Sequence, residues 1–146
     1  MAIGVEIGAY MVPDFKKYWP NMFQWCQWTL VSAPNVPMLL SVIYSVMAKI
    51  EGNSKMEEGN VIAISGPTFW TEKIKEYLER EKGLTEKDLL NIKKEPLDLG
   101  DLLLLPMVAF SPDGGGQWMK QMGSNFAGSP GSLVSHKWAG TWKSNN

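Results

Sequence analysis

Apolar and polar residues alternate along the chain in short runs that predict several strands and helices. Residues 2–8 combine small and β-branched side chains around Glu6 and predict a first strand. Residues 22–33 are rich in aromatic side chains and lack glycine and proline, and they predict a buried helix. In residues 38–50 the apolar positions recur every three or four residues, which predicts a helix with a broad buried face.

The remaining runs complete the pattern of an α/β domain. The apolar runs at 61–64 and 102–105 predict buried strands, and 107–110 predicts a further extended segment. Residues 67–81 place apolar side chains on one face of a helix. We therefore expect one small mixed sheet with flanking helices, in a single domain that spans residues 1–146.

Charged residues gather in one part of the chain. Fourteen of the 24 residues between 72 and 95 are charged, with both signs mixed, which predicts a solvated outer edge. Within it, Thr85-x-x-Asp88 predicts a capping box, and Asp98-x-x-Asp101 after it predicts a cap or turn. The formal net charge of -1 offers no basic surface for a nucleic-acid backbone.

The rarest residue types exclude several kinds of site. A single cysteine, Cys26, excludes an internal disulfide framework, and a single histidine, His136, excludes a three-histidine zinc site. The longest apolar run, 102–110, contains Pro106 and falls far short of the roughly 20 residues of a membrane-spanning helix. The first residues lack the basic start and apolar core of a signal peptide.

Candidate chemistry lies near the end of the chain. The imidazole of His136 can bind a divalent metal, although it can equally be a hydrogen-bonded structural residue. Lys143 can meet a phosphate, and Gly140 lets backbone N–H groups approach an anion. Trp138 and Trp142 could form the walls of a pocket or simply pack in a core.

Two other places carry groups that could bind a ligand. The turn Ser65-Gly66-Pro67 opens a helix, whose free N–H groups favour anions or sugar hydroxyls; an ordinary helix start is the alternative. Glu6 is a carboxylate on an otherwise apolar strand. It could bind a sugar hydroxyl or orient an acceptor, or it could lie at an exposed strand end. The sequence has none of the motifs GxxxxGK[ST], GxGxxG, GxSxG or HExxH, and no Asp-x-Asp.

The order of the segments along the chain is more specific than any one of them. From the N-terminus to the C-terminus, these segments are Gly4-Val5-Glu6, Phe23-Gln24-Trp25-Cys26-Gln27-Trp28-Thr29, Ala33-Pro34-x-x-Pro37, Ser65-Gly66-Pro67-x-x-x-Thr71, Leu105-Pro106-x-x-x-Phe110-Ser111-Pro112, Met122-Gly123-Ser124 and His136-x-x-x-Gly140-Thr141-Trp142-Lys143. This order resembles the sugar-transferase family defined by a DXD motif. Within that family it is most similar to the fungal initiation-specific α-1,6-mannosyltransferases of the Golgi, over nearly the whole chain.

The resemblance implies a fold, a reaction and a set of site residues. The fold is the GT-A type, a Rossmann-like sheet with flanking helices. The reaction moves mannose from GDP-mannose to a glycan acceptor with retention, and a divalent metal, usually manganese, bridges the diphosphate to the DXD aspartates. The implied positions are His136 at the metal or the diphosphate, Gly140, Trp142 and Lys143 at the diphosphate, Ser65, Gly66 and Pro67 in a turn beside the donor sugar and the acceptor, and Glu6 as the acidic residue after the DXD strand.

The chain also departs from the family pattern. The family's DXD lies upstream of the strand that begins here at Ile3, so we expect residues 1–146 to be the C-terminal part of one glycosyltransferase catalytic domain. Such a part would be inactive alone and would associate through an exposed apolar face. The alternative is a non-catalytic remnant of the fold that binds a sugar or a partner. The resemblance implies the Golgi lumen, although the sequence carries no anchor.

Overall fold

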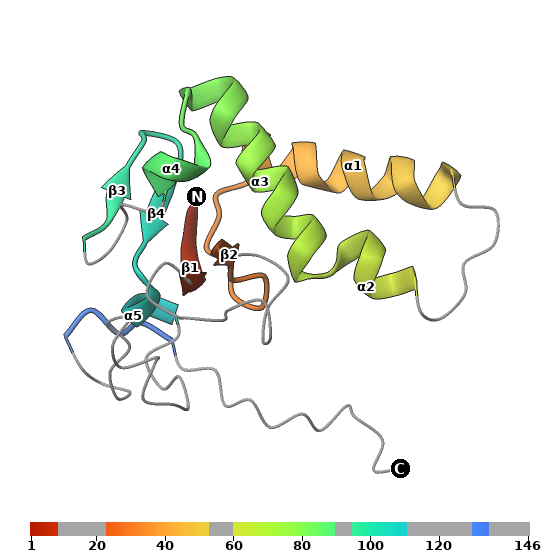
Figure 1. The fold of residues 1–146 in the computed structure, drawn as a ribbon. Coiled ribbons are helices and arrows are strands. Elements are labelled where there is room, and N and C mark those ends of the chain that lie inside the picture. Colours follow the sequence, from red (N-terminus) through yellow and green to blue (C-terminus); the bar gives the residue numbers. More distant parts are fainter. Residues whose placement is uncertain (9–22, 53–59, 90–94, 111–129, 135–146) are drawn as a thin grey trace, which may run out of the picture.

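The structure is a computed structural model that describes residues 1–8, 23–52, 60–89, 95–110 and 130–134 (Figure 1). These residues form an α/β arrangement of short strands and helices. The elements are β1 (Ala2–Gly8), β2 (Phe23–Trp25), α1 (Pro37–Gly52), α2 (Asn60–Ser65), α3 (Pro67–Lys82), α4 (Glu86–Leu89), β3 (Leu97–Asp98), β4 (Leu103–Leu105) and α5 (Met107–Phe110).

The strand β1 lies inside a mixed sheet. Among the described residues this sheet has four strands in the order β2-β1-β4-β3. β1 pairs parallel with β4, with Ala2 opposite Leu103, and antiparallel with β2; β3 pairs antiparallel with β4. The strands predicted at 2–8 and 102–105 are therefore confirmed, and they are neighbours in one small mixed sheet.

Helix α3 confirms the helix predicted at 67–81. Pro67 starts it after Gly66, whose backbone is extended. Gly83 ends the helix in the left-handed conformation, with φ of 65°, and its N–H donates to the carbonyl oxygen of Glu79 at 3.1 Å. The buried side of the helix packs into the core that also holds residues of β1, β2 and β4. This side is formed by Phe69, Trp70, Thr71, Ile74, Tyr77 and Leu78.

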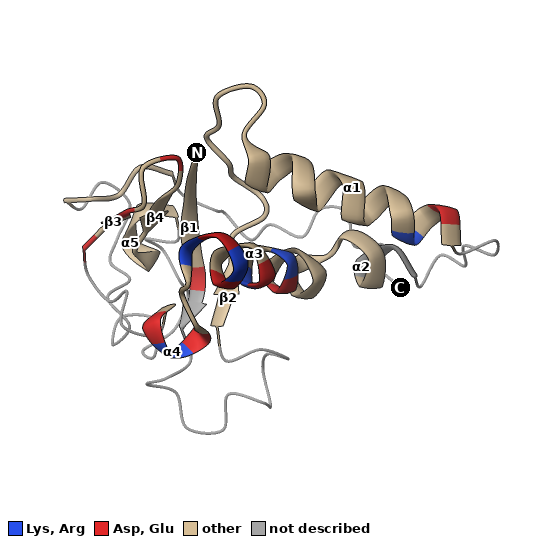
Figure 2. Cartoon of the chain, turned by 90° about the horizontal axis from the view of Figure 1, so that it is seen from above, with Lys and Arg blue, Asp and Glu red and all other residues tan. Residues whose placement is uncertain are grey.

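The charged residues of α3 and α4 are exposed or half-buried, as the sequence predicts for this part of the chain, and Figure 2 shows where they lie along the two helices. The predicted capping box is confirmed, because Thr85 donates its hydroxyl and its backbone N–H to Oδ2 of Asp88 at 2.6 and 2.8 Å. Asp98 accepts the N–H of Gly100 at 2.8 Å, in the turn that joins β3 to β4. The prediction of a turn there is confirmed as well.

The helix predicted at 22–33 is wrong. Phe23–Trp25 form the strand β2, and Val31 makes a further isolated bridge with Ala2. Phe23 and Trp25 are fully buried, with their rings in an edge-to-face contact 4.7 Å apart. A short aromatic run fits a buried strand as well as a buried helix, and pairing with β1 decides the outcome here.

Two shorter segments predicted as extended are helical. The run at 61–64 belongs to helix α2, and 107–110 is helix α5. Runs of four apolar residues carry too little periodicity to separate a strand from a buried helical turn. Local contacts favour the helices: Pro106 directly precedes α5, and the Nζ of Lys49 donates to the carbonyl oxygen of Ala63 in α2 at 2.8 Å.

The helix predicted at 38–50 is confirmed as α1, but its broad buried face is not. Of its residues, Met38 and Val42 are buried. α1 packs beside α3 and extends away from the sheet (Figure 1), and the apolar side chains on one side of it are exposed. We call this side the α1 face. It consists of Leu40, Ile43, Tyr44, Met47 and Ile50, which are between 36% and 65% exposed.

Gly4 is required by the close packing of β1 against α5. A Cβ atom added to Gly4 would lie 2.5 Å from a ring carbon of Phe110, well inside van der Waals contact. The glycine therefore lets α5 approach the sheet, and it does so without any unusual backbone conformation.

Replacing Gly4 should thus destabilise the protein through overpacking. We expect Gly4→Ala to lower the free energy of unfolding by about 1–3 kcal/mol. Gly52→Ala is the matched control, because no atom lies within 4 Å of the added Cβ at that helix end. Urea unfolding of both variants checks the prediction, and equal midpoints would contradict the packing argument.

Candidate functional site

Glu6 lies at an irregularity in the pairing of β1 with β2. Val5 is opposite Trp25, whereas Ile7 is opposite Gln24, so the register shifts across Glu6. A β-bulge of this kind redirects a side chain, and bulges are common beside active sites. The Glu6 residue is only 6% exposed. The alternative of an exposed strand end is therefore wrong, and the carboxylate is a buried acid.

The carboxylate of Glu6 is held by side-chain donors. The Nε2 of Gln24, itself buried, donates to Oε2 of Glu6 at 3.0 Å. Burial raises the pKa of Glu6 above its ordinary value, whereas hydrogen bonds from the side chains of Gln24 and Trp28 favour the ionised form and lower it. Burial is the larger effect. Perturbed acids of this kind are frequent at functional sites.

The strand that carries Gln24 is fixed on helix α3. The backbone N–H of Trp25 donates to Oγ1 of Thr71 at 3.1 Å. The indole Nε1 of Trp70 donates to the carbonyl oxygen of Cys26 at 3.0 Å. The N–H of Cys26 in turn donates to the carbonyl oxygen of Gly4 at 2.9 Å. These bonds satisfy buried backbone groups that an irregular strand would otherwise leave unpaired.

Three of the quoted sequence segments are thus connected to one another. Gly4-Val5-Glu6 of β1 pairs with the aromatic segment that carries Gln24, and that segment in turn contacts helix α3, which follows the Ser65-Gly66-Pro67 turn. Neither Gln24 nor the hydroxyl of Thr71 has a separate role among the predictions made from the sequence. The available signal is one polar residue between two large aromatic residues.

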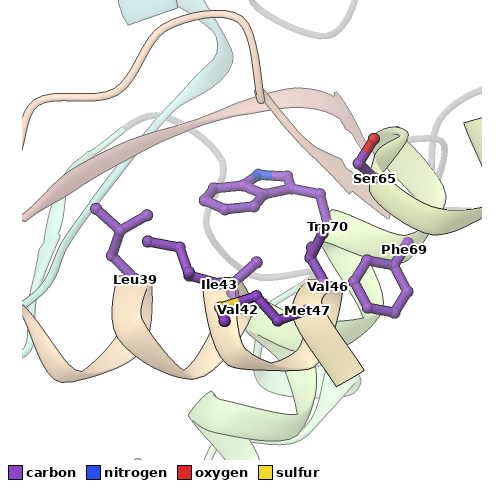
Figure 3. A pocket seen from close by; sticks show the side chains of 8 residues that line it. All are labelled: Leu39, Val42, Ile43, Val46, Met47, Ser65, Phe69 and Trp70. Atoms are coloured by element: carbon purple, nitrogen blue, oxygen red, sulfur yellow. The ribbon is translucent and has the colours of Figure 1, made fainter. Parts of the chain in front are cut away.

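The turn Ser65-Gly66-Pro67 joins α2 to α3 and lies beside an apolar groove (Figure 3). The groove has a volume of about 260 Å³, and Ser65 is among its lining residues. The other lining residues are Leu39, Val42, Ile43, Val46, Met47, Phe69 and Trp70. Because its lining is mostly apolar, this groove would bind an apolar surface more favourably than a charged diphosphate. The C-terminal segment, to which the resemblance assigns the diphosphate, lies outside the described residues.

The predicted metal and diphosphate residues cannot be placed. His136, Gly140, Trp142 and Lys143 all lie outside the described residues. Within the described part of the chain, no three histidine, cysteine or acidic side chains gather to hold a metal ion.

Along almost its whole length, the chain is similar to two proteins that are named as mannosyltransferases. It is 33% identical over 148 residues to the "Initiation-specific alpha-1,6-mannosyltransferase" of Schizosaccharomyces pombe, covering 98% of this chain and 36% of that protein. It is 27% identical over 168 residues to the protein of the same name in Candida albicans, covering 98% of this chain and 42% of that protein. The resemblance deduced from motif order is confirmed. The chain spans well under half the length of these relatives.

Other comparisons add no further information. No protein-family model matches the chain, and no solved structure matches it. Among the described residues, no helix has the length and apolar character needed to cross a bilayer.

Proposed function

We propose that this chain is the C-terminal part of a GT-A type glycosyltransferase domain. The whole domain would transfer mannose from GDP-mannose to the N-glycans of glycoproteins, with retention at the anomeric carbon, in the Golgi lumen. The observation that carries the proposal is similarity across 98% of the chain to two proteins that are both named initiation-specific alpha-1,6-mannosyltransferases. The α/β arrangement with its small mixed sheet is compatible with this fold.

Glu6 is the candidate catalytic residue of the described part. Its buried carboxylate would accept a hydrogen bond from a hydroxyl group of the donor or acceptor sugar. Burying a carboxylate opposes folding, since the ionised form loses its hydration. A residue that destabilises the fold in this way is typical of a group retained for function.

The donor would be held by two other groups of residues. Ser65, Gly66 and Pro67 would lie beside the donor sugar. Gly140, Trp142 and Lys143 would face the diphosphate, where the ammonium group of the lysine opposes the phosphate charge. His136 would complete a manganese site whose carboxylates come from an Asp-x-Asp that this sequence does not contain. The metal, when bound, supplies a Lewis acid for the departing diphosphate.

The second candidate function is a non-catalytic module that binds a sugar or a partner. The exposed α1 face favours it, since contiguous apolar surface marks interaction sites.

Donor binding tests the mannosyltransferase proposal. The chain, joined to an upstream Asp-x-Asp segment of the family, should bind GDP-mannose only with manganese present. His136→Ala should weaken that binding at least about tenfold, the effect of losing one metal ligand or its support, with an unchanged unfolding midpoint. Lys137→Ala is the neighbouring control. Titration calorimetry measures both, and equal affinities would end the assignment of His136 to the metal.

A further inference from the structure

Gln24 is an unusual residue for the middle of a short strand. Phe23, Gln24 and Trp25 are all buried, so β2 is covered on both of its faces. A buried amide is unfavourable unless its polar atoms find partners. The Nε2 of Gln24 finds one in Oε2 of Glu6, at the point where the register of the two strands shifts.

Among the described residues, the elements that pack against β1 offer no charge to replace this amide. The packed elements β2, β4 and α5 contain no charged side chain. The titratable group among the residues next to β2 is the buried thiol of Cys26. Within the described residues, the groups that favour the ionised carboxylate are therefore the side chains of Gln24 and Trp28.

On the basis of the function proposed above, we propose that Gln24 is a positioning residue of the sugar-transfer site. Its amide N–H holds the carboxylate of Glu6 in one orientation at the β-bulge, ready to accept a hydrogen bond from a sugar hydroxyl. Thr71 supports this arrangement from α3, because it accepts the N–H of Trp25 and so fixes the strand that carries Gln24. The effect of Gln24 on a sugar is thus exerted through Glu6.

The first arm of the test needs no activity. Gln24→Met keeps a similar shape without the N–H donor, and Gln27→Met changes an exposed glutamine of the same segment. Carbon-13 NMR titration of the Glu6 carboxyl in the 146-residue chain should show a higher pKa in Gln24→Met than in the unchanged chain. Gln27→Met should leave the pKa of Glu6 unchanged. An unaltered Glu6 titration in Gln24→Met overturns the proposal.

The second arm measures transfer by the chain joined to an Asp-x-Asp segment. Gln24→Met should lose about tenfold in rate near neutral pH, as expected for one hydrogen bond to a charged group. The loss should become smaller as pH rises, because the carboxyl group of Glu6, whose pKa is higher in this variant, ionises at higher pH than in the unchanged chain. A loss that is the same at every pH indicates a merely structural residue and overturns the proposal. If the unchanged fusion transfers nothing, the proposed function fails, and the NMR arm still decides whether Gln24 positions Glu6.

Discussion

The 146-residue chain by itself should transfer no mannose from GDP-mannose above background. In the proposed reaction the leaving diphosphate needs a cation held beside it, and carboxylates are usual ligands of such a cation. Within the described residues no such cluster exists, and His136 with Lys143 would add one neutral imidazole and one positive charge. Without a firmly bound cation the leaving group lacks its stabilising charge.

Joining the chain to an upstream Asp-x-Asp segment of the family should restore manganese-dependent transfer to a mannose-terminated glycan. The same fusion should be more soluble, because we expect the α1 face to meet that segment, whereas the chain alone should associate. Transfer of labelled mannose and light scattering provide the two measurements. A fusion in which Asn replaces both aspartates is the control. A monomeric chain that turns over GDP-mannose on its own would overturn the proposal.

Helix α3 illustrates what could be predicted from the sequence. Local chemistry fixes both ends of this helix. Proline is favoured at the first position of a helix and disfavoured inside one, so Pro67 marks the start, and Gly83 marks the end because it adopts the left-handed conformation that other residues avoid. Its buried face follows from the spacing of Trp70, Ile74 and Leu78. Local signals of this kind do not depend on the rest of the fold, and they gave correct bounds to within a residue.

The elements that were predicted wrongly depend on contacts made far away in the sequence. β2 is a strand because β1 is available as its partner, and the aromatic residues alone do not specify that partner. α1 has a regular apolar pattern, yet several of its apolar positions are exposed, because helical spacing predicts which face is apolar and not what covers it.

The candidate site could be predicted only in part, because much of it also depends on contacts between segments that lie far apart in the sequence. Glu6 stands out in the sequence as an acid within an apolar strand. The β-bulge that redirects it, the donor Gln24 and the support from Thr71 follow from the register of two strands and the docking of a helix. A register shift of one residue has no local sequence signal strong enough to read in advance.

Replacing Glu6 by glutamine should raise stability and abolish transfer together. Because the pKa of Glu6 is raised in the folded protein, its contribution to stability is greatest below the unfolded value of about 4.3 and is lost as pH rises through the folded value. Glu6→Gln should therefore be more stable than the unchanged chain at pH 7 and similar to it near pH 4. In the fusion, loss of the carboxylate should reduce transfer at least about a hundredfold.

Asp101→Asn is the matched control, because its pH dependence has the opposite sign. The hydrogen bond and ion pair with Lys82 lower the pKa of Asp101, so its contribution is present above the unfolded value of about 3.9 and is lost as pH falls through the folded value. This variant should be less stable at pH 7 and should transfer normally. Urea unfolding at several pH values, with transfer by the matching fusions, separates the two acids. A Glu6→Gln protein that is less stable at pH 7 and fully active would mean that Glu6 serves the fold and not the reaction.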